Sequence, residues 1–222
     1  MKKILLIVAI AISTFSLNSC KSKEDKANEL IKQEMFKTLY DFESYQPVET
    51  LIDSAFTNPC TNDTIIYAAM KAVEDIDKCL EALDEVKDAQ RSMSIWSDSY
   101  SSYGRSEYRE AKDKMEEAYN KAKENMQQHI AAIKVIRKKS VNYPHEFIGW
   151  QATHKYRCKT KGGHSALGTE LYIFDKGIKN VLFSINVEDE DYIKAVGYIK
   201  DISGYSDEEF NKFIQDAENA FK

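Results

Sequence analysis

MEEAYNKAKENMQQHIAAIKVI, residues 115–136, places its apolar and half-polar side chains at alternating spacings of four and three residues. This spacing keeps one stripe of a helix against a neighbouring helix, as in coiled coils. The stripe consists of Met115, Tyr119, Ala122, Met126, His129, Ile133 and Ile136. We therefore expect a long amphipathic helix that packs against a second helix.

A second stripe with the same spacing lies upstream and predicts the partner helix. It consists of Ala69, Val73, Ile76, Leu80 and Leu83. Between the stripes, residues 97–104 read SDSYSSYG, a composition typical of turns. Two helices of about 30 residues with a short connection fold back antiparallel, so we expect a helical hairpin over residues 63–140. The expected N-caps are Asp63 or Thr64 for the first helix and Ser102 or Ser106 for the second.

After the hairpin the period changes to two, which is typical of half-buried strands. One face carries Trp150, Ala152, His154, Tyr156 and Cys158, and the other is polar, with Lys155, Arg157 and Lys159. Turn residues at 161–163 and 175–177 separate this strand from two more, at residues 171–174 and 181–187. The three strands are expected to form an antiparallel meander.

The remaining segments complete an α+β fold. We expect a helix at residues 27–40 and a strand at 48–55, with a short helical turn as the alternative to the strand. Two amphipathic helices follow the meander at residues 189–202 and 206–221, the second opened by a Ser206 to Glu209 capping box. The expected architecture is a small antiparallel sheet of three to four strands, its inner face covered by helices, with the helical hairpin inserted.

The N-terminus has the layout of a secretory signal. Met1-Lys2-Lys3 precedes an apolar run at residues 4–15, and a charged stretch begins after Cys20. The run is too short for the alternative, a retained membrane helix, which needs about 20 residues. The segment Leu17-Asn18-Ser19-Cys20 resembles the lipobox of bacterial lipoproteins. That resemblance implies removal of residues 1–19, thioether lipidation of Cys20 and stable attachment to a membrane.

Four segments are expected along the chain. They are the signal peptide at residues 1–19, a lipidated tether at 20–28, an α+β domain at 29–62 plus 141–222, and the helical hairpin at 63–140.

Two further segments resemble a group of uncharacterised lipoproteins from Bacteroidota. They are LYDFESYQPV at residues 39–48 with a following IDSAF at 52–56, and HKYRCK at 154–159 with a later YIFD at 172–175. The resemblance implies a lipid-anchored protein of the cell envelope, at the outer membrane, and it implies no activity. Which face of that membrane carries the protein stays open.

Asp-Ser/Thr-apolar tripeptides at Ser54 and Thr64 resemble the O-glycosylation motif of the same bacteria. The resemblance implies that these two hydroxyls are candidate glycosylation sites.

The charge of the chain argues against one class of function. The net charge of −5 becomes −7 once Lys2 and Lys3 leave with the signal peptide, and this acidity argues against nucleic-acid binding.

Cys60, Cys79 and Cys158 are expected to stay free thiols, because a helix from Asp63 places Cys79 about 24 Å along its axis from Cys60.

No motif predicts catalysis, a metal or a cofactor. His154 and Cys158 are four residues apart on one strand, about 13 Å, which is too far to chelate one ion. The chain contains no Gly-x-Ser-x-Gly nucleophile elbow and no glycine-rich phosphate loop. We therefore expect no cofactor and no catalytic residues.

The best candidates for recognition are Trp96, Tyr100 and Tyr103 at the hairpin tip, where they could contact a partner protein or a glycan. The competing interpretation is that Trp96 and Tyr108 staple the helix ends together. A second candidate is the basic face of Lys155, Arg157 and Lys159, which could meet an acidic partner or a lipid head group, or merely protect a sheet edge.

The function expected from these features is that of an envelope-anchored, non-enzymatic binding or scaffolding module. Its partners would be the membrane, through the lipid, and an envelope protein or glycan. The alternatives are a hydrolase or glycan-processing enzyme with an unrecognised site, and a coiled-coil oligomerisation device. The oligomeric state stays open.

Overall fold

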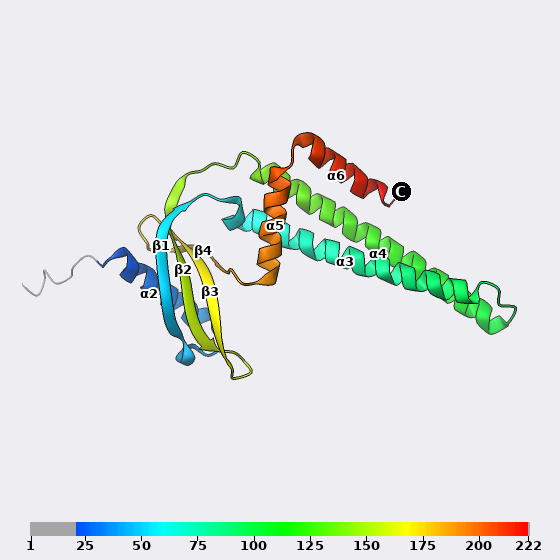
Figure 1. The fold of residues 1–222 in the computed structure, drawn as a ribbon, viewed down its shortest axis with the longest axis horizontal. Coiled ribbons are helices and arrows are strands. Elements are labelled where there is room, and N and C mark those ends of the chain that lie inside the picture. The colour runs from blue at the N-terminus through cyan, green and yellow to red at the C-terminus, as the bar shows by residue number, and fades with distance from the viewer. Residues whose placement is uncertain (1–20, 222) are drawn as a thin grey trace, which may run out of the picture. The chain divides into compact units, whose positions relative to one another are not determined.

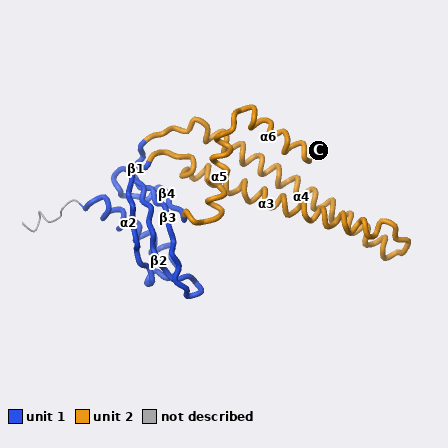
Figure 2. The backbone as a smooth tube through the Cα atoms, viewed as in Figure 1, with its two compact units in different colours: residues 1–55, 147–186 blue, residues 56–146, 187–222 orange. Residues whose placement is uncertain are grey.

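The computed structural model describes residues 21–221. The expected signal peptide at residues 1–19 and the expected lipidation site Cys20 lie outside the described residues. The described chain divides into two compact units (Figure 2). The sheet unit comprises the described residues up to Ala55 together with Phe147–Asn186, and the hairpin unit comprises Phe56–Glu146 together with the described residues from Val187 onward.

The sheet unit confirms the expected α+β class. Its sheet has the strand order β1-β2-β3-β4, and β2 and β3 pair antiparallel, as do β3 and β4. Glu49 and Thr50 of β1 contact Lys155 and His154 of β2 respectively, so this pair also runs antiparallel. The elements are α2 (Lys23–Thr38), the 3-10 turn η1 (Phe42–Ser44), β1 (Gln46–Phe56), β2 (Phe147–Lys159), β3 (Ser165–Asp175) and β4 (Val181–Asn186).

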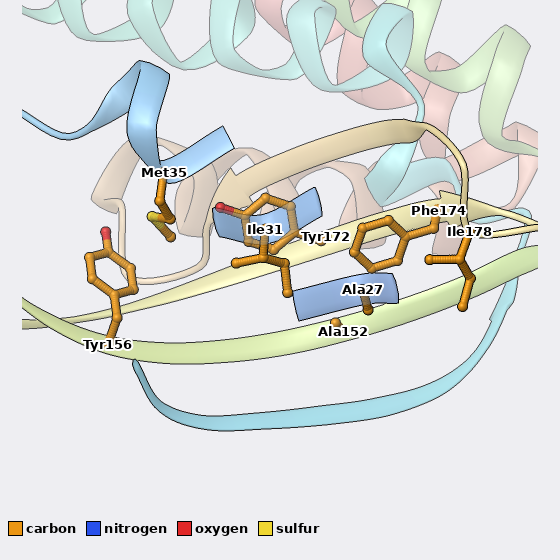
Figure 3. Close-up of a cluster of buried hydrophobic side chains, with 8 residues drawn as sticks. All are labelled: Ala27, Ile31, Met35, Ala152, Tyr156, Tyr172, Phe174 and Ile178. Carbon is orange, nitrogen blue, oxygen red and sulfur yellow. The ribbon is translucent and has the colours of Figure 1, made fainter. Parts of the chain in front are cut away.

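Helix α2 covers one face of this sheet (Figure 1) and forms its core (Figure 3). The helix contributes small and flexible side chains, and the strands contribute aromatic ones. Figure 3 shows the buried cluster: Ala27, Ile31, Met35, Ala152, Tyr156, Tyr172, Phe174 and Ile178. The expected inner face of β2 is therefore confirmed.

Helix α2 begins at Lys23, so the expected tether of residues 20–28 is wrong beyond Ser22. The Ser22 hydroxyl accepts the N–H of Asp25 at 3.1 Å, and the Asp25 carboxylate accepts the N–H of Ser22 at 3.1 Å. This capping box satisfies two backbone donors at the start of the helix. The lysine-rich composition suggested a solvated linker, but charged residues on the outer face of a capped helix do not interrupt it.

Two glycines allow neighbouring atoms of the sheet to come closer than a Cβ atom would permit. Gly149 has φ +155°, and a Cβ there would lie 2.0 Å from the carbonyl oxygen of Phe174. Gly168 pairs with Tyr156 across β2 and β3, and a Cβ would lie 2.9 Å from the phenol oxygen of Tyr156. Glycine therefore leaves room for the strand contact at one position and for the Tyr156 ring at the other.

The interior position of β2 corrects the interpretation of its basic face. Because β1 and β3 flank β2, Lys155, Arg157 and Lys159 cannot protect an edge of the sheet. Lys155 instead pairs with Glu49 on β1 at 3.2 Å. Opposite charges on neighbouring strands support the pairing of β1 with β2.

The hairpin unit contains the expected antiparallel helical hairpin, with α3 and α4 side by side in Figure 1. Its elements are the 3-10 turn η2 (Pro59–Thr61), α3 (Asp63–Trp96), α4 (Ser102–Ser140), α5 (Glu190–Gly204) and α6 (Asp207–Asn219). The caps are one residue earlier than expected. Asn62 caps α3 and Ser101 caps α4, and the Ser206 to Glu209 capping box of α6 is confirmed.

The buried stripe of α3 differs from the expected one. Ala69 and Val73 are buried as expected, but Leu80 is 54% exposed. The stripe keeps the 4-3 spacing through smaller residues: Ala72, Asp75, Cys79, Ala82, Val86 and Ala89. In α4 the buried Ala111 and Ala118 were missed, whereas Ala122, His129, Ile133 and Ile136 are buried as expected. Small side chains at these positions let the two helices approach closely.

Two polar residues lie in this helix interface. The Nδ1–H of His129 donates to the carbonyl oxygen of Ala72 at 2.8 Å. The Asp75 carboxylate is completely buried and pairs with Lys71 through Oδ1 at 2.6 Å, while its Oδ2 has no partner among the described residues. Polar groups in such an interface favour one alignment of the helices over shifted ones.

The two C-terminal helices pack on the hairpin, within the same unit as α3 and α4, which corrects their expected position on the sheet. In α5, the ring of Tyr198 meets that of His129 edge to face at 5.8 Å. Beyond α6, Phe221 packs against Cys79, Ala82 and Ala122. The physical reason is that α2 already occupies the apolar face of the sheet.

Candidate functional site

The aromatic residues expected to contact a partner gather at the hairpin tip. Tyr100 is 95% exposed, Tyr103 is 64% exposed, and Ile95 in the last turn of α3 is 73% exposed. Trp96 is half-buried, and its ring meets Tyr103 edge to face at 5.6 Å. Trp96 thus takes Tyr103, and not the expected Tyr108, as its ring partner. The result is an exposed apolar cluster, which we call the tip cluster: Ile95, Trp96, Tyr100 and Tyr103.

Hydrogen bonds hold the loop that carries Tyr100. The Ser101 hydroxyl accepts the N–H of Gly104 at 2.9 Å, and the hydroxyls of Ser99 and Ser101 lie 3.1 Å apart. Arg105 donates to the carbonyl oxygen of Tyr100. A Cβ on Gly104 would lie 1.9 Å from the Ser99 hydroxyl oxygen, so a larger residue at this position would displace the Ser99 side chain. A loop ordered in advance loses less conformational entropy when it binds.

A groove between α3 and α4 leads to the tip cluster; we call it the acidic groove. It has a volume of about 470 Å³ and a floor of Ala89, Ala111 and Ala118. Its rim consists of Glu85, Asp88, Ser92, Glu107, Glu110, Lys114, Glu117 and Lys121.

Lys114 pairs with Glu110 at 2.7 Å and Lys121 with Glu85 at 3.5 Å. Glu107 and Glu117 have no ion pair within the described chain. The rim therefore carries excess negative charge.

Heptad spacing places the acidic groove and the tip cluster on one face of the hairpin. Trp96 follows the floor residue Ala89 by seven positions, and Tyr103 precedes the rim residue Glu110 by seven. Residues seven apart on a helix lie nearly above one another. A partner that contacts the tip cluster can therefore extend along the acidic groove.

A second concave surface lies in the sheet unit, between α2 and β1; we call it the sheet groove. Its volume is about 770 Å³. Helix α2 contributes Asn28 and Lys32, and β1 contributes Val48 and Thr50. The sequence did not predict this site, because the site depends on where α2 meets β1. The local signal for it is the aromatic pair Phe42 and Tyr45.

A chain of hydrogen bonds runs from the sheet groove into the core at His154. The Tyr45 hydroxyl lies 2.8 Å from Nε2 of His154, and the Thr50 hydroxyl lies 2.9 Å from its Nδ1. Thr50 also donates to the amide oxygen of Asn28 at 2.8 Å. Because Thr50 has a single proton, His154 must donate from Nδ1 and accept the Tyr45 proton at Nε2.

This geometry favours the neutral form of His154 and engages both of its ring nitrogens in hydrogen bonds. The side chain is 1% exposed, and burial lowers the pKa of its imidazole. Both ring nitrogens are engaged, so His154 has no free nitrogen to accept a proton from a substrate. Burial also raises the pKa of Tyr45, which keeps that phenol a hydrogen-bond donor at neutral pH. In this arrangement His154 can orient the Tyr45 and Thr50 hydroxyls but cannot act as a general base.

The two candidate glycosylation residues lie in different environments. Thr64 is exposed in the first turn of α3, whereas Ser54 is half-buried in β1. Cys20, the residue expected to carry the lipid, is outside the described range. Cys60, Cys79 and Cys158 are free thiols, as expected, and burial raises the pKa of each.

Within residues 21–221, no three His, Cys, Asp or Glu side chains come together in a way that could hold a metal ion. None of the helices described over this range combines the length and hydropathy that crossing a bilayer requires. Comparison of the chain with family models, curated proteins and solved structures found no match.

Proposed function

We propose that this chain is a lipid-anchored protein of the cell envelope, without catalytic activity, whose hairpin binds another envelope protein through the tip cluster. The observation that carries this proposal is the exposure of Tyr100 and Tyr103 beside Trp96 on a hydrogen-bonded loop. Tyrosine and tryptophan dominate the binding energy of many protein interfaces. They supply a large contact area with few rotatable bonds.

The charge of the adjacent acidic groove supports a basic partner. Glu107 and Glu117 lie along the same face as the tip cluster and have no ion pair among the described residues. Complementary charge accelerates association and selects partners. The binding proposed here should therefore weaken as the salt concentration rises.

The lipid anchor belongs to the same proposal. Helix α2 starts at Lys23, three residues after Cys20. Three residues span about 10 Å at most. A diacylglyceryl group on Cys20 would therefore hold the start of α2 at the membrane surface. Thr64, which is exposed, is the better of the two candidate glycosylation sites.

The two alternatives receive less support. A hydrolase that used His154 as its base would need a free ring nitrogen, whereas both nitrogens of His154 are engaged. A coiled-coil oligomerisation device would need a second apolar stripe along the hairpin. On the open face of the hairpin, charged residues rim the alanine floor of the acidic groove.

The test is a comparison of surface tyrosines. The double variant Tyr100→Ser with Tyr103→Ser should abolish partner capture from detergent-solubilised envelopes. Tyr67, which is 73% exposed on the first turns of α3, supplies the matched control Tyr67→Ser. The control should capture as much partner as the unmodified protein. Equal capture by the tip variant and the unmodified protein would contradict the proposal, provided that both variants show the same helical circular dichroism.

A further inference from the structure

We propose that the sheet groove binds a neutral saccharide, an activity separate from the protein contact at the hairpin tip. The groove lies between α2 and β1, beside the start of the 3-10 turn η1. Its volume of about 770 Å³ is in the range of sites for small molecules. The residues that carry the argument are Asn28, Lys32, Phe42, Glu43, Tyr45 and Val48.

The hydrogen-bond chain behind the groove determines which polar atoms face a ligand. The Asn28 amide oxygen accepts from Thr50, which leaves its two N–H donors without a partner among the described residues. The Tyr45 proton is committed to His154, so the Tyr45 oxygen can accept a hydrogen bond. The buried imidazole thus fixes a donor on Asn28 and an acceptor on Tyr45 at neighbouring positions.

Charged groups around the groove add further hydrogen-bond donors and acceptors to those of Asn28 and Tyr45. Lys32 supplies donors, and Glu24 and Glu43 supply acceptors. None of these three forms an ion pair within the described part of the chain. A sugar hydroxyl both donates and accepts, so adjacent hydroxyls can bond to an acceptor and a donor side by side.

The apolar part of the groove suits the ring of a sugar. Phe42 and Tyr45 are stacked, with ring centroids 5.4 Å apart and an interplanar angle of 13°. Val48 adds an exposed aliphatic surface on β1. Aromatic faces are weakly negative and attract polarised C–H groups such as those of a pyranose ring.

Charge excludes other ligand classes. Two unpaired carboxylates against one ammonium disfavour an anion, whether phosphate or acidic sugar. An extended peptide paired to the edge of β1 is disfavoured by Pro47, which has no N–H to donate at that edge. A neutral ligand rich in hydroxyl groups can donate to the carboxylates and accept from the ammonium group without adding a charge of its own.

The test measures binding of defined probes to the full chain in detergent by isothermal titration calorimetry. The probes are neutral tetrasaccharides of glucose, of mannose and of N-acetylglucosamine, an acidic tetragalacturonate, and an extended heptapeptide of neutral residues. At least one neutral tetrasaccharide should bind more tightly than the tetragalacturonate and the peptide. Absence of binding by all three neutral sugars, or tighter binding of the acidic sugar or the peptide, would overturn the proposal.

Two groove variants and one control test whether the sugar binds in the sheet groove. Asn28→Ala removes the amide donors and should weaken binding about tenfold, the value of one net hydrogen bond. Lys32→Ala, an exposed residue with no ion pair in the described chain, should also weaken it and does not disturb the His154 chain. Asn120→Ala on the exposed surface of α4 is the matched control and should leave affinity unchanged. Unchanged affinity in both groove variants would place the sugar elsewhere.

Different results would contradict the two proposals, sugar binding in the sheet groove and partner binding at the hairpin tip. Sugar binding should survive Tyr100→Ser with Tyr103→Ser, and partner capture at the tip should survive Asn28→Ala. Loss of sugar binding in the tip variant would overturn the assignment to the sheet groove.

Discussion

The two units build their interiors in opposite ways. The hairpin unit packs two long helices that follow one another in the chain on a stripe of small residues, including Ala72, Ala82 and Ala122. The sheet unit packs large aromatic residues, including Tyr172 and Phe174, under a helix that precedes them by more than 100 residues. Many contacts between small side chains of two consecutive helices hold the hairpin, whereas a few contacts between large side chains of distant segments hold the sheet unit. The two units should therefore respond differently to mutation.

The largest effect is expected from removing an aromatic side chain from the sheet unit. Phe174→Ala should lower the free energy of unfolding by about 3–5 kcal/mol, because a fully buried ring is replaced by a cavity. Urea unfolding read from Trp150 fluorescence, in a Trp96→Phe background, reports on this unit. The control Leu167→Ala, on the same strand but 55% exposed, should change the free energy by less than about 1 kcal/mol. Similar losses in both variants would contradict the assigned core.

Enlarging a small buried residue, the opposite change, should destabilise the hairpin unit. Ala82→Leu places a large side chain in the helix interface and should destabilise the hairpin unit by about 1–3 kcal/mol. Trp96 fluorescence in a Trp150→Phe background can follow this unit. Leu80→Ala, which truncates an exposed residue, should shift stability by only about 0.5 kcal/mol. If Leu80→Ala proves the more damaging change, the apolar stripe expected from the sequence is correct and the observed one is not.

A smaller effect separates the two possible caps of α3. Asn62 accepts the N–H groups of Thr64 and Ile65 at 3.1 and 3.2 Å. Asn62→Ala should cost about 1 kcal/mol of hairpin stability, because both donors lose their acceptor. Asp63→Ala serves as the neighbouring control, measured in the same urea titration. A greater loss from Asp63→Ala would return the cap to the residue expected from the sequence.

The smallest effect is a pH dependence confined to the sheet unit. Burial lowers the native pKa of His154 below its ordinary value of 6.5, so the unfolded chain takes up a proton first. The stability held above pH 6.5 should therefore decline as the pH falls from 6.5 through the lowered native pKa. The stability of His154→Gln, followed by Trp150 fluorescence, should vary less over this range. An equal pH dependence in both proteins would show that His154 does not titrate as proposed.

The sequence predicted the hairpin well because its signal repeats over many helical turns. Met115 to Ile136 alone repeats the 4-3 spacing several times, so single errors do not hide the helix. The exact buried face was harder to predict, because alanine, cysteine and aspartate carry little hydropathy signal. For this reason the hydropathy pattern favours Leu80 over Cys79 as the buried residue, although the smaller Cys79 is the one that fits between the helices.

The sequence could not predict which helices cover the sheet. Helices α2, α5 and α6 all have apolar stripes, and nothing local distinguishes the one that packs on β2 and β3. The sheet groove depends on that choice, because Asn28 meets Thr50 only when α2 lies on the sheet. The aromatic members of the tip cluster were predictable because Trp96, Tyr100 and Tyr103 lie within eight residues around one loop. The exposed Ile95 was missed.

The central claim, that the hairpin tip contacts a partner, is tested most directly by photocrosslinking in intact envelopes. A benzophenone amino acid at Tyr100 should yield a discrete crosslinked protein, and the same amino acid at Tyr67 should not. The yield at Tyr100 should fall when the rim of the acidic groove is reversed by Glu107→Lys with Glu117→Lys. Crosslinking that is absent at Tyr100, or equal at Tyr100 and Tyr67, would contradict the account.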